Sequence, residues 1–96
     1  MYYLRKLPER KIFDVKKTDG TTIHNDYITD DVALYKDNSH GRFYRRDMGD
    51  NNKGMKLYQC KKMSTILQKR EALYTYCKEW FEVYDENGKV KLEKTD

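Results

Sequence analysis

The stretch Met63–Tyr84 constrains the fold of this chain most, because it is the long segment with a clear helical period. Apolar side chains recur there at spacings of three, four and seven, which places them on one stripe of a helix. The stripe consists of Met63, Ile66, Leu73, Cys77 and Trp80, with Leu67, Tyr74 and Phe81 beside it. Ser64 is the expected N-cap, because its hydroxyl can accept a hydrogen bond from an unpaired backbone N–H. We therefore expect one long amphipathic helix.

The end of this helix is open to two interpretations. Phe81–Asp85 and Lys89–Glu93 alternate around an Asn-Gly pair, which is typical of tight β-hairpins. The first interpretation ends the helix near Glu79 and begins a C-terminal hairpin. The second continues the helix to Tyr84 and uses Gly88 to stop the chain. We adopt the first.

The chain before the helix has the pattern of short strands separated by turns. The strands are expected over Arg10–Lys16, Thr21–Ile28, Val32–Lys36, Arg42–Arg46 and Met55–Cys60. Tyr2–Leu7 is expected to be a short apolar start, separated by Pro8 from the first regular strand. Every link is short enough for a hairpin or a corner. The prediction is an α+β fold: an antiparallel β-meander with one long amphipathic helix packed on one face and a C-terminal β-hairpin.

The composition favours a single small α+β domain over residues 1–96. Charged residues make up 38%, but aromatic residues at 14% allow a core that a disordered chain would lack. Such a core leaves little stability to spare, and a homodimer would be one way to bury more surface. No secretory segment or membrane-length apolar run is seen. We expect a cytoplasmic protein (host cytoplasm if phage-encoded) in which Cys60 and Cys77 are buried free thiols.

Strand alternation sorts the expected sheet into two faces. The inner face, toward the helix, would hold Val32, Leu34, Phe43, Met55 and Leu57. The outer face would hold Tyr35, Arg42, Tyr44, Arg46, Lys56 and Tyr58. Cations interleaved with tyrosines can bind phosphate or carboxylate groups and stack on bases, and both types are enriched at protein interfaces. The same residues would also be ordinary cross-strand neighbours on a half-exposed sheet.

Two cations of the helix complete the candidate partner-binding set. Lys69 and Arg70 project within roughly 60° of the centre of the apolar stripe in a regular helix. Either their stems pack while their charges stay in water, or they extend past the core to a ligand or partner.

The sequence shows no strong motif for catalysis, metal binding or nucleotide binding. Its histidines and cysteines lack the short paired spacings of metal ligands. The aspartates gather in turn windows, where Asp commonly caps backbone groups. Gly49 and Gly54 are not followed by the Lys-Ser/Thr of a phosphate loop. We therefore expect no catalytic residue, no metal, no cofactor and no enzymatic activity.

The net charge of +4 comes from 20 basic and 16 acidic residues, so the charge is mixed and not gathered in a basic tail. The order of hairpins followed by a helix resembles small arm-type and AP2-type DNA-binding domains in topology alone. The small size and the Lys/Tyr/Asn-rich composition resemble accessory proteins of phages and other mobile elements.

These features lead to two hypotheses of function. The first is a small interaction or inhibitor protein, of the kind that phages use against host defence, with a larger host protein or complex as its partner. The alternative is a nucleic-acid-binding module that contacts DNA or RNA through the basic, Tyr-bearing sheet face. Sequestering a small phosphorylated ligand would need an oligomeric pocket.

Overall fold

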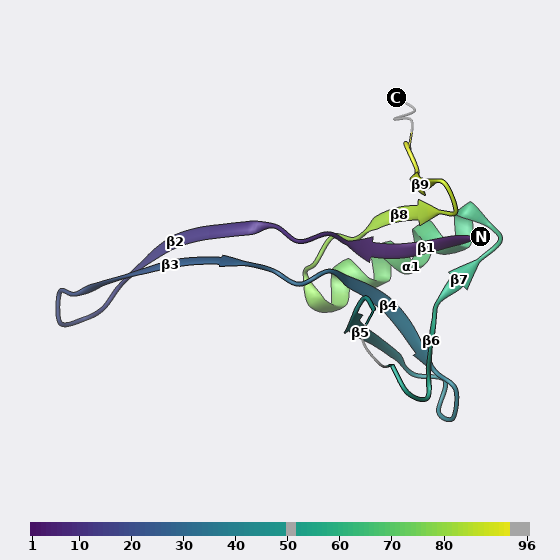
Figure 1. Cartoon of the computed structure of the whole chain (residues 1–96), viewed down its shortest axis with the longest axis horizontal. Helices are drawn as coiled ribbons and strands as arrows, with labels where there is room; N and C mark the ends of the chain where they lie inside the picture. The colour runs from purple at the N-terminus through teal and green to yellow at the C-terminus, as the bar shows by residue number, and fades with distance from the viewer. Residues whose placement is uncertain (50–51, 93–96) are drawn as a thin grey trace.

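A computed structural model, which describes residues 1–49 and 52–92, shows a small body and one long projecting hairpin (Figure 1). The body contains α1 (Met63–Cys77) and the strands β1 (Tyr2–Lys6), β4 (Val32–Asp37), β5 (Phe43–Asp47), β6 (Met55–Leu57), β7 (Gln59–Cys60), β8 (Glu82–Asp85) and β9 (Gly88–Lys89). The projecting hairpin, which we call the arm, consists of β2 (Arg10–Lys16) and β3 (Thr22–Ile28). The α+β class, with antiparallel strands and one helix packed on the sheet, is confirmed, and the helix is short at 15 residues.

The sheet of the body is organised around β1. Its strand order is β5-β4-β1-β8-β9, with β6 beside β4 and β7 beside β1. The segment Tyr2–Leu7, which the sequence pattern left as a short apolar start, therefore provides the central strand. Consecutive strands do not all pair: β1 pairs with β4 across the arm, and β8 returns from far along the chain. The hairpin of β2 and β3 forms a separate two-stranded sheet.

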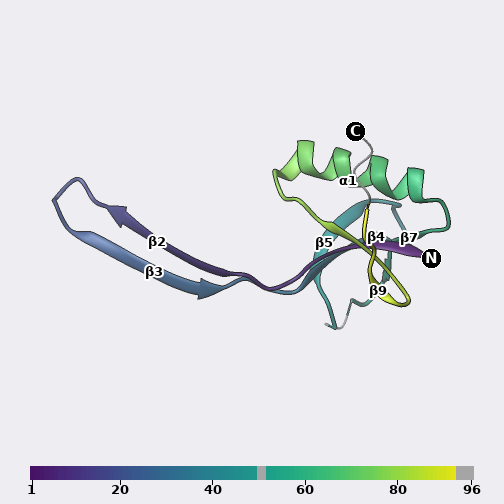
Figure 2. The ribbon, with the colours of Figure 1, turned by 90° about the horizontal axis from the view of Figure 1, so that it is seen from above.

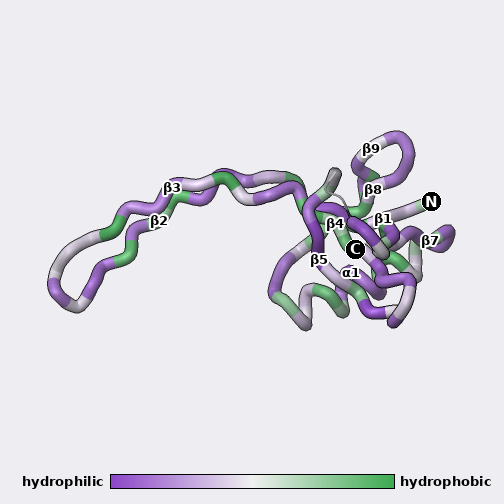
Figure 3. The backbone as a smooth tube through the Cα atoms, turned by 60° about the horizontal axis from the view of Figure 1, so that its bottom comes forward, coloured by the Kyte–Doolittle hydropathy of each residue, from purple (hydrophilic) through white to green (hydrophobic). Residues whose placement is uncertain are grey.

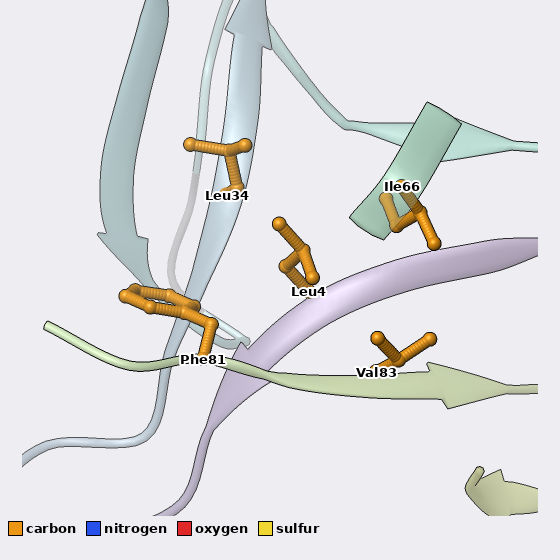
Figure 4. Close-up of a cluster of buried hydrophobic side chains, with 5 residues drawn as sticks. All are labelled: Leu4, Leu34, Ile66, Phe81 and Val83. Atoms are coloured by element: carbon orange, nitrogen blue, oxygen red, sulfur yellow. The ribbon is translucent and has the colours of Figure 1, made fainter. Parts of the chain in front are cut away.

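The core of the body is a small apolar cluster between the sheet and α1 (Figures 2 and 4). It consists of Leu4, Leu34, Ile66, Phe81 and Val83, each at most 1% exposed. Each such side chain contributes about 1.5–3 kcal/mol when it leaves water. The cluster joins β1, β4, α1 and β8, so it holds together segments from both ends of the chain.

The helix begins and ends close to its predicted limits. Lys62 is the N-cap and makes no side-chain capping hydrogen bond, so the N-cap prediction for Ser64, inside the first turn, is wrong. At the other end, Lys78 adopts a left-handed conformation with φ of 58°, and its N–H donates to the carbonyl of Tyr74 at 2.8 Å. This conformation ends the helix and excludes a continuation to Tyr84. No helix within the described ranges is long and apolar enough to cross a membrane.

Both predicted hairpins form. In the arm, all seven residues of β2 pair with β3, from Arg10 opposite Ile28 to Lys16 opposite Thr22. The Asp-Gly turn closes its tip, with Gly20 at a φ of 90°. The C-terminal hairpin pairs β8 with β9, but its second strand is shorter than predicted. It ends at Lys89, residues 90–92 are not in a strand, and Glu93 lies outside the described residues.

Candidate interaction surfaces

The structure assembles part of the predicted outer face of the sheet. Tyr35 lies opposite Tyr44, and Arg46 lies opposite Ala33, so these residues share the face away from α1. Arg42, Tyr44 and Arg46 are exposed there. Tyr35 is buried at 8% exposure, and its hydroxyl contacts the sulfur of Met48 at 3.6 Å. Three of the six predicted residues therefore form an accessible row along β5.

The sorting is wrong for β6. Lys56 pairs with Lys36, which also pairs with Phe43, so Lys56 lies on the helix side. Tyr58 follows on the same side, where its ring packs at 86° to that of Phe43 with 5.0 Å between centroids. Met55 and Leu57 correspondingly lie on the outer face. A shift of one residue exchanges the two faces of a strand, and the register of β6 with β4 differs by one residue from the predicted one.

The side chains of Lys69 and Arg70 rest on aromatic rings within the body. The Lys69 Nζ lies 3.6 Å from the centroid of Phe43 and 5.6 Å from that of Tyr58. The Arg70 guanidinium lies 4.2 Å from the centroid of Trp80. Burial raises the pKa of Tyr58 to about 12, and a hydrogen bond with Cys60 adds to the shift. These distances show that Lys69 and Arg70 both make cation–π contacts at the edge of the core.

A groove lies between β5 and α1, which we call the β5–α1 groove. It encloses about 550 Å³. Its apolar lining comes from Leu34, Phe43, Ala72, Leu73 and Cys77, with the exposed ring of Tyr76 at one side. Arg42, Arg45 and Lys69 also line it, and Arg45 forms an ion pair with Glu79. The groove is apolar inside and positively charged at its rim.

The arm presents an uncovered apolar face to solvent. Side chains of paired residues lie on the same side of a ribbon and alternate along it. Hydrophobic and hydrophilic segments follow one another along both strands of the arm (Figure 3). One side carries Phe13, Val15, Ile23 and Tyr27, which are 41–50% exposed and which we call the apolar arm face. Phe13 and Tyr27 pack edge to face with 6.0 Å between ring centroids.

The opposite side of the arm is mostly polar, with Ile12 and Ile28 as its exposed apolar side chains. It carries an ion pair between Arg10 and Asp26 at 2.7 Å and a contact between His24 and Asp14 at 2.7 Å. At the root of the arm, Arg5 donates two hydrogen bonds to Asp31, at 2.9 and 2.6 Å. The arm is therefore an amphipathic ribbon whose apolar side contacts none of the core cluster.

Sequence reasoning found both strands of the arm but missed their exposure. The pattern predicted Arg10–Lys16 and Thr21–Ile28 as ordinary strands of one meander. The strands β1 and β4 pair directly with each other, so the arm, which lies between them in the chain, is excluded from their sheet. The sequence pattern does not show this pairing, because it is a long-range contact.

The described part of the chain contains no group of three or more His, Cys, Asp or Glu side chains suited to a metal ion. Cys60 and Cys77 are free thiols and are half-buried rather than buried. No protein-family model, curated protein or solved structure matches the chain.

Proposed function

We propose that this chain is a non-enzymatic interaction protein that inserts its arm into an apolar cleft of a larger protein. The apolar arm face carries the proposal. A two-stranded ribbon alone in water is marginally stable, and this one exposes two aromatic and two β-branched side chains in a row. A cleft that covers the row would remove this apolar surface from water and hold the ribbon in place.

The charges of the arm favour a protein partner over a polyanion. The cations Arg10, Lys11, Lys16 and Lys17 are nearly balanced by Asp14, Asp19 and Asp26. Arg10 is paired with Asp26, and Lys11 is paired with Glu9 at the arm root. Binding to phosphates requires cations that are free to replace counterions. The arm offers few free cations beside the apolar arm face.

The shape of the molecule suits the occupation of a site on a larger body. Seven-residue strands reach roughly 24 Å at about 3.4 Å per residue, and the molecule as a whole extends 52 Å along its longest axis. An arm of this length reaches a recessed surface that the body cannot enter (Figure 1). A protein that blocks a host defence protein in the host cytoplasm, as expected from the sequence, would act in this way.

The test compares two double variants, each of which replaces two exposed apolar side chains by serine, on opposite sides of the arm. Phe13→Ser with Tyr27→Ser removes apolar surface from the apolar arm face. Ile12→Ser with Ile28→Ser removes it from the opposite side, where these side chains are 57% and 70% exposed. Proteins captured from nuclease-treated host lysate are purified, and their affinity for wild type and both variants is measured by calorimetry. We expect the first variant to lose at least tenfold in affinity and the second to bind like wild type.

Two outcomes would overturn the proposal. Equal binding by both variants would remove the apolar arm face from the interface. A concentration-dependent dimer in light scattering, lost only in the Phe13/Tyr27 variant, would show that a second copy of the chain covers the arm instead.

A second candidate is the nucleic-acid-binding module. It is favoured by Arg42 and Arg46, which flank Tyr44 on the exposed face of β5, where a base could stack between two phosphate contacts.

A further inference from the structure

The strand β5 forms an open edge of the body sheet. In the described ranges of the chain it pairs with β4 alone. The N–H of Asp37 donates to the carbonyl of Arg42 at 2.8 Å, and the N–H of Met48 donates to the carbonyl of Asp31 at 2.7 Å. Hydrogen-bonded and non-bonded pairs alternate in an antiparallel ladder. The backbone N–H and C=O groups of Phe43 and Arg45 therefore point away from β4, toward the open edge.

The β5–α1 groove runs beside this edge. Four consecutive residues, 42–45, line it together with residues of α1. Consecutive residues of a strand line the same space when that space follows the backbone edge, because their side chains alternate between faces. An extended chain that paired with β5 would place every second side chain over Leu34, Leu73 and Cys77 in the groove.

The charges around the edge favour an acidic occupant. Arg46 lies on the outer face of β5, and strand alternation places Arg42 on the same face. Arg42, Arg45 and Lys69 all line the β5–α1 groove. The side chain of Arg42 makes no hydrogen bond or ion pair with any other described residue, whereas the side chain of Arg45 is paired with Glu79. Cations along an edge strand repel a second copy of the same edge. They attract a strand that carries carboxylates.

We propose that β5 binds an extended peptide of alternating apolar and acidic residues, which adds to the body sheet as a further strand. Its backbone pairs with Phe43 and Arg45, its apolar side chains fill the β5–α1 groove, and its carboxylates meet Arg42 and Arg46 on the outer face. This site is separate from the apolar arm face and does not depend on the function proposed for the arm.

The test uses a fluorescein-labelled heptapeptide, acetylated Glu-Val-Glu-Val-Glu-Val-Glu amide, and fluorescence polarisation with the whole chain. We expect saturable binding that weakens at least tenfold in the Arg42→Glu/Arg46→Glu variant. The control variant Lys61→Glu/Lys62→Glu makes the same charge change at exposed positions away from the groove and should bind like wild type. A peptide with Lys in place of every Glu should not bind.

Strand addition is tested by N-methylation of the peptide, which leaves the protein unchanged. Methylating the Val nitrogens and methylating the Glu nitrogens give two peptides, and only one set faces β5. We expect one peptide to lose binding and the other to keep it, with amide NMR shifts centred on Phe43 and Arg45. Binding by both peptides, or equal binding of the Lys peptide, would overturn the proposal. The Phe13→Ser/Tyr27→Ser variant should bind the heptapeptide normally, so failure here is distinct from failure of the arm.

Discussion

Trp80 and Phe81 are adjacent in the chain but lie in different environments. The apolar stripe of the predicted helix would place Trp80 in the core. In the structure, however, Trp80 is 41% exposed and Phe81 is fully buried. The cause is the left-handed turn at Lys78, which ends the helix before Trp80 and redirects the chain. Trp80 then packs edge to face on Tyr74 and beneath Arg70.

This difference predicts unequal effects on stability. Trp80→Ala removes an aromatic pair and a partly exposed cation–π contact, and should lower the free energy of unfolding by about 1–2 kcal/mol. Phe81→Ala removes a fully buried ring and should cost about 3–5 kcal/mol. Urea denaturation of both variants measures the two values. An equal or larger loss for Trp80→Ala would place that ring in the core after all.

The ion pair at the arm root predicts a pH-dependent contribution to stability. Hydrogen bonds from Arg5 lower the pKa of Asp31, whose side chain is 28% exposed. Because the pKa is lower in the folded chain, the stabilisation is present above the unfolded value of about 3.9 and is lost as the pH falls through the folded value. Asp31→Asn should lower the free energy of unfolding by about 1 kcal/mol at pH 7. The difference in free energy of unfolding between this variant and wild type should become smaller below about pH 4.

The neighbouring Asp30 provides the control for this experiment. Its side chain makes no hydrogen bond or ion pair among the described residues. Asp30→Asn removes the same charge without removing an ion pair, so it should cost little free energy of unfolding at pH 7. Thermal unfolding of both variants across a pH series measures the comparison. The same narrowing in both variants would mean that the effect comes from overall charge and not from the Arg5–Asp31 pair.

At the scale of elements, the arm and the body are held by different interactions. The arm is held by its own ladder and by contacts at its root, where the N–H of Thr29 donates to the carbonyl of Glu9 at 2.9 Å. No member of the core cluster lies between residues 10 and 28. The body should then fold without the arm.

Replacing residues 10–28 by an Asn-Gly turn tests this separation. Thr29 and Glu9 already pair, so a two-residue turn joins them without strain. We expect the free energy of unfolding to change by no more than about 1 kcal/mol, because surface changes away from the core are usually small. Far-ultraviolet circular dichroism during thermal unfolding measures it. Loss of the cooperative transition would show that the arm supports the body.

The sequence was sufficient for local features and insufficient for those set by distant pairing. Local features depend on residues that are close together in the sequence. These features are the helical period, the Asp-Gly turn and the Asn-Gly turn, and they predicted α1 and both hairpins. The central role of β1 was not, because the pairing of Leu4 with Val83 joins opposite ends of the chain. The accessible row on β5 was predicted by alternation. The opposite phase of β6 was not, because it depends on the register in which β6 pairs with β4.

At the scale of the whole molecule, the distribution of charge favours the proposed interaction protein over the nucleic-acid-binding module. The excess of 20 basic over 16 acidic residues is modest, and Arg5, Arg10 and Arg45 are committed to ion pairs. The exposed cations on the face of β5 are few. Each neutralised phosphate adds about −0.9 to the slope of the logarithm of the binding constant against the logarithm of the salt concentration. A contact through Arg42 and Arg46 alone therefore gives a shallow slope.

We therefore expect weak binding to generic nucleic acid. For a duplex of about 20 base pairs at about 0.15 M salt, the dissociation constant should lie in the non-specific range of about 10⁻⁴–10⁻⁶ M, with a log–log salt slope of about −2. Fluorescence anisotropy across a salt series measures both, with the Arg42→Glu/Arg46→Glu variant as the matched comparison. Nanomolar affinity with a steep slope that this variant abolishes would make the sheet face a nucleic-acid site. The apolar arm face would then need another explanation, because apolar surface on the arm adds nothing to contacts with phosphates.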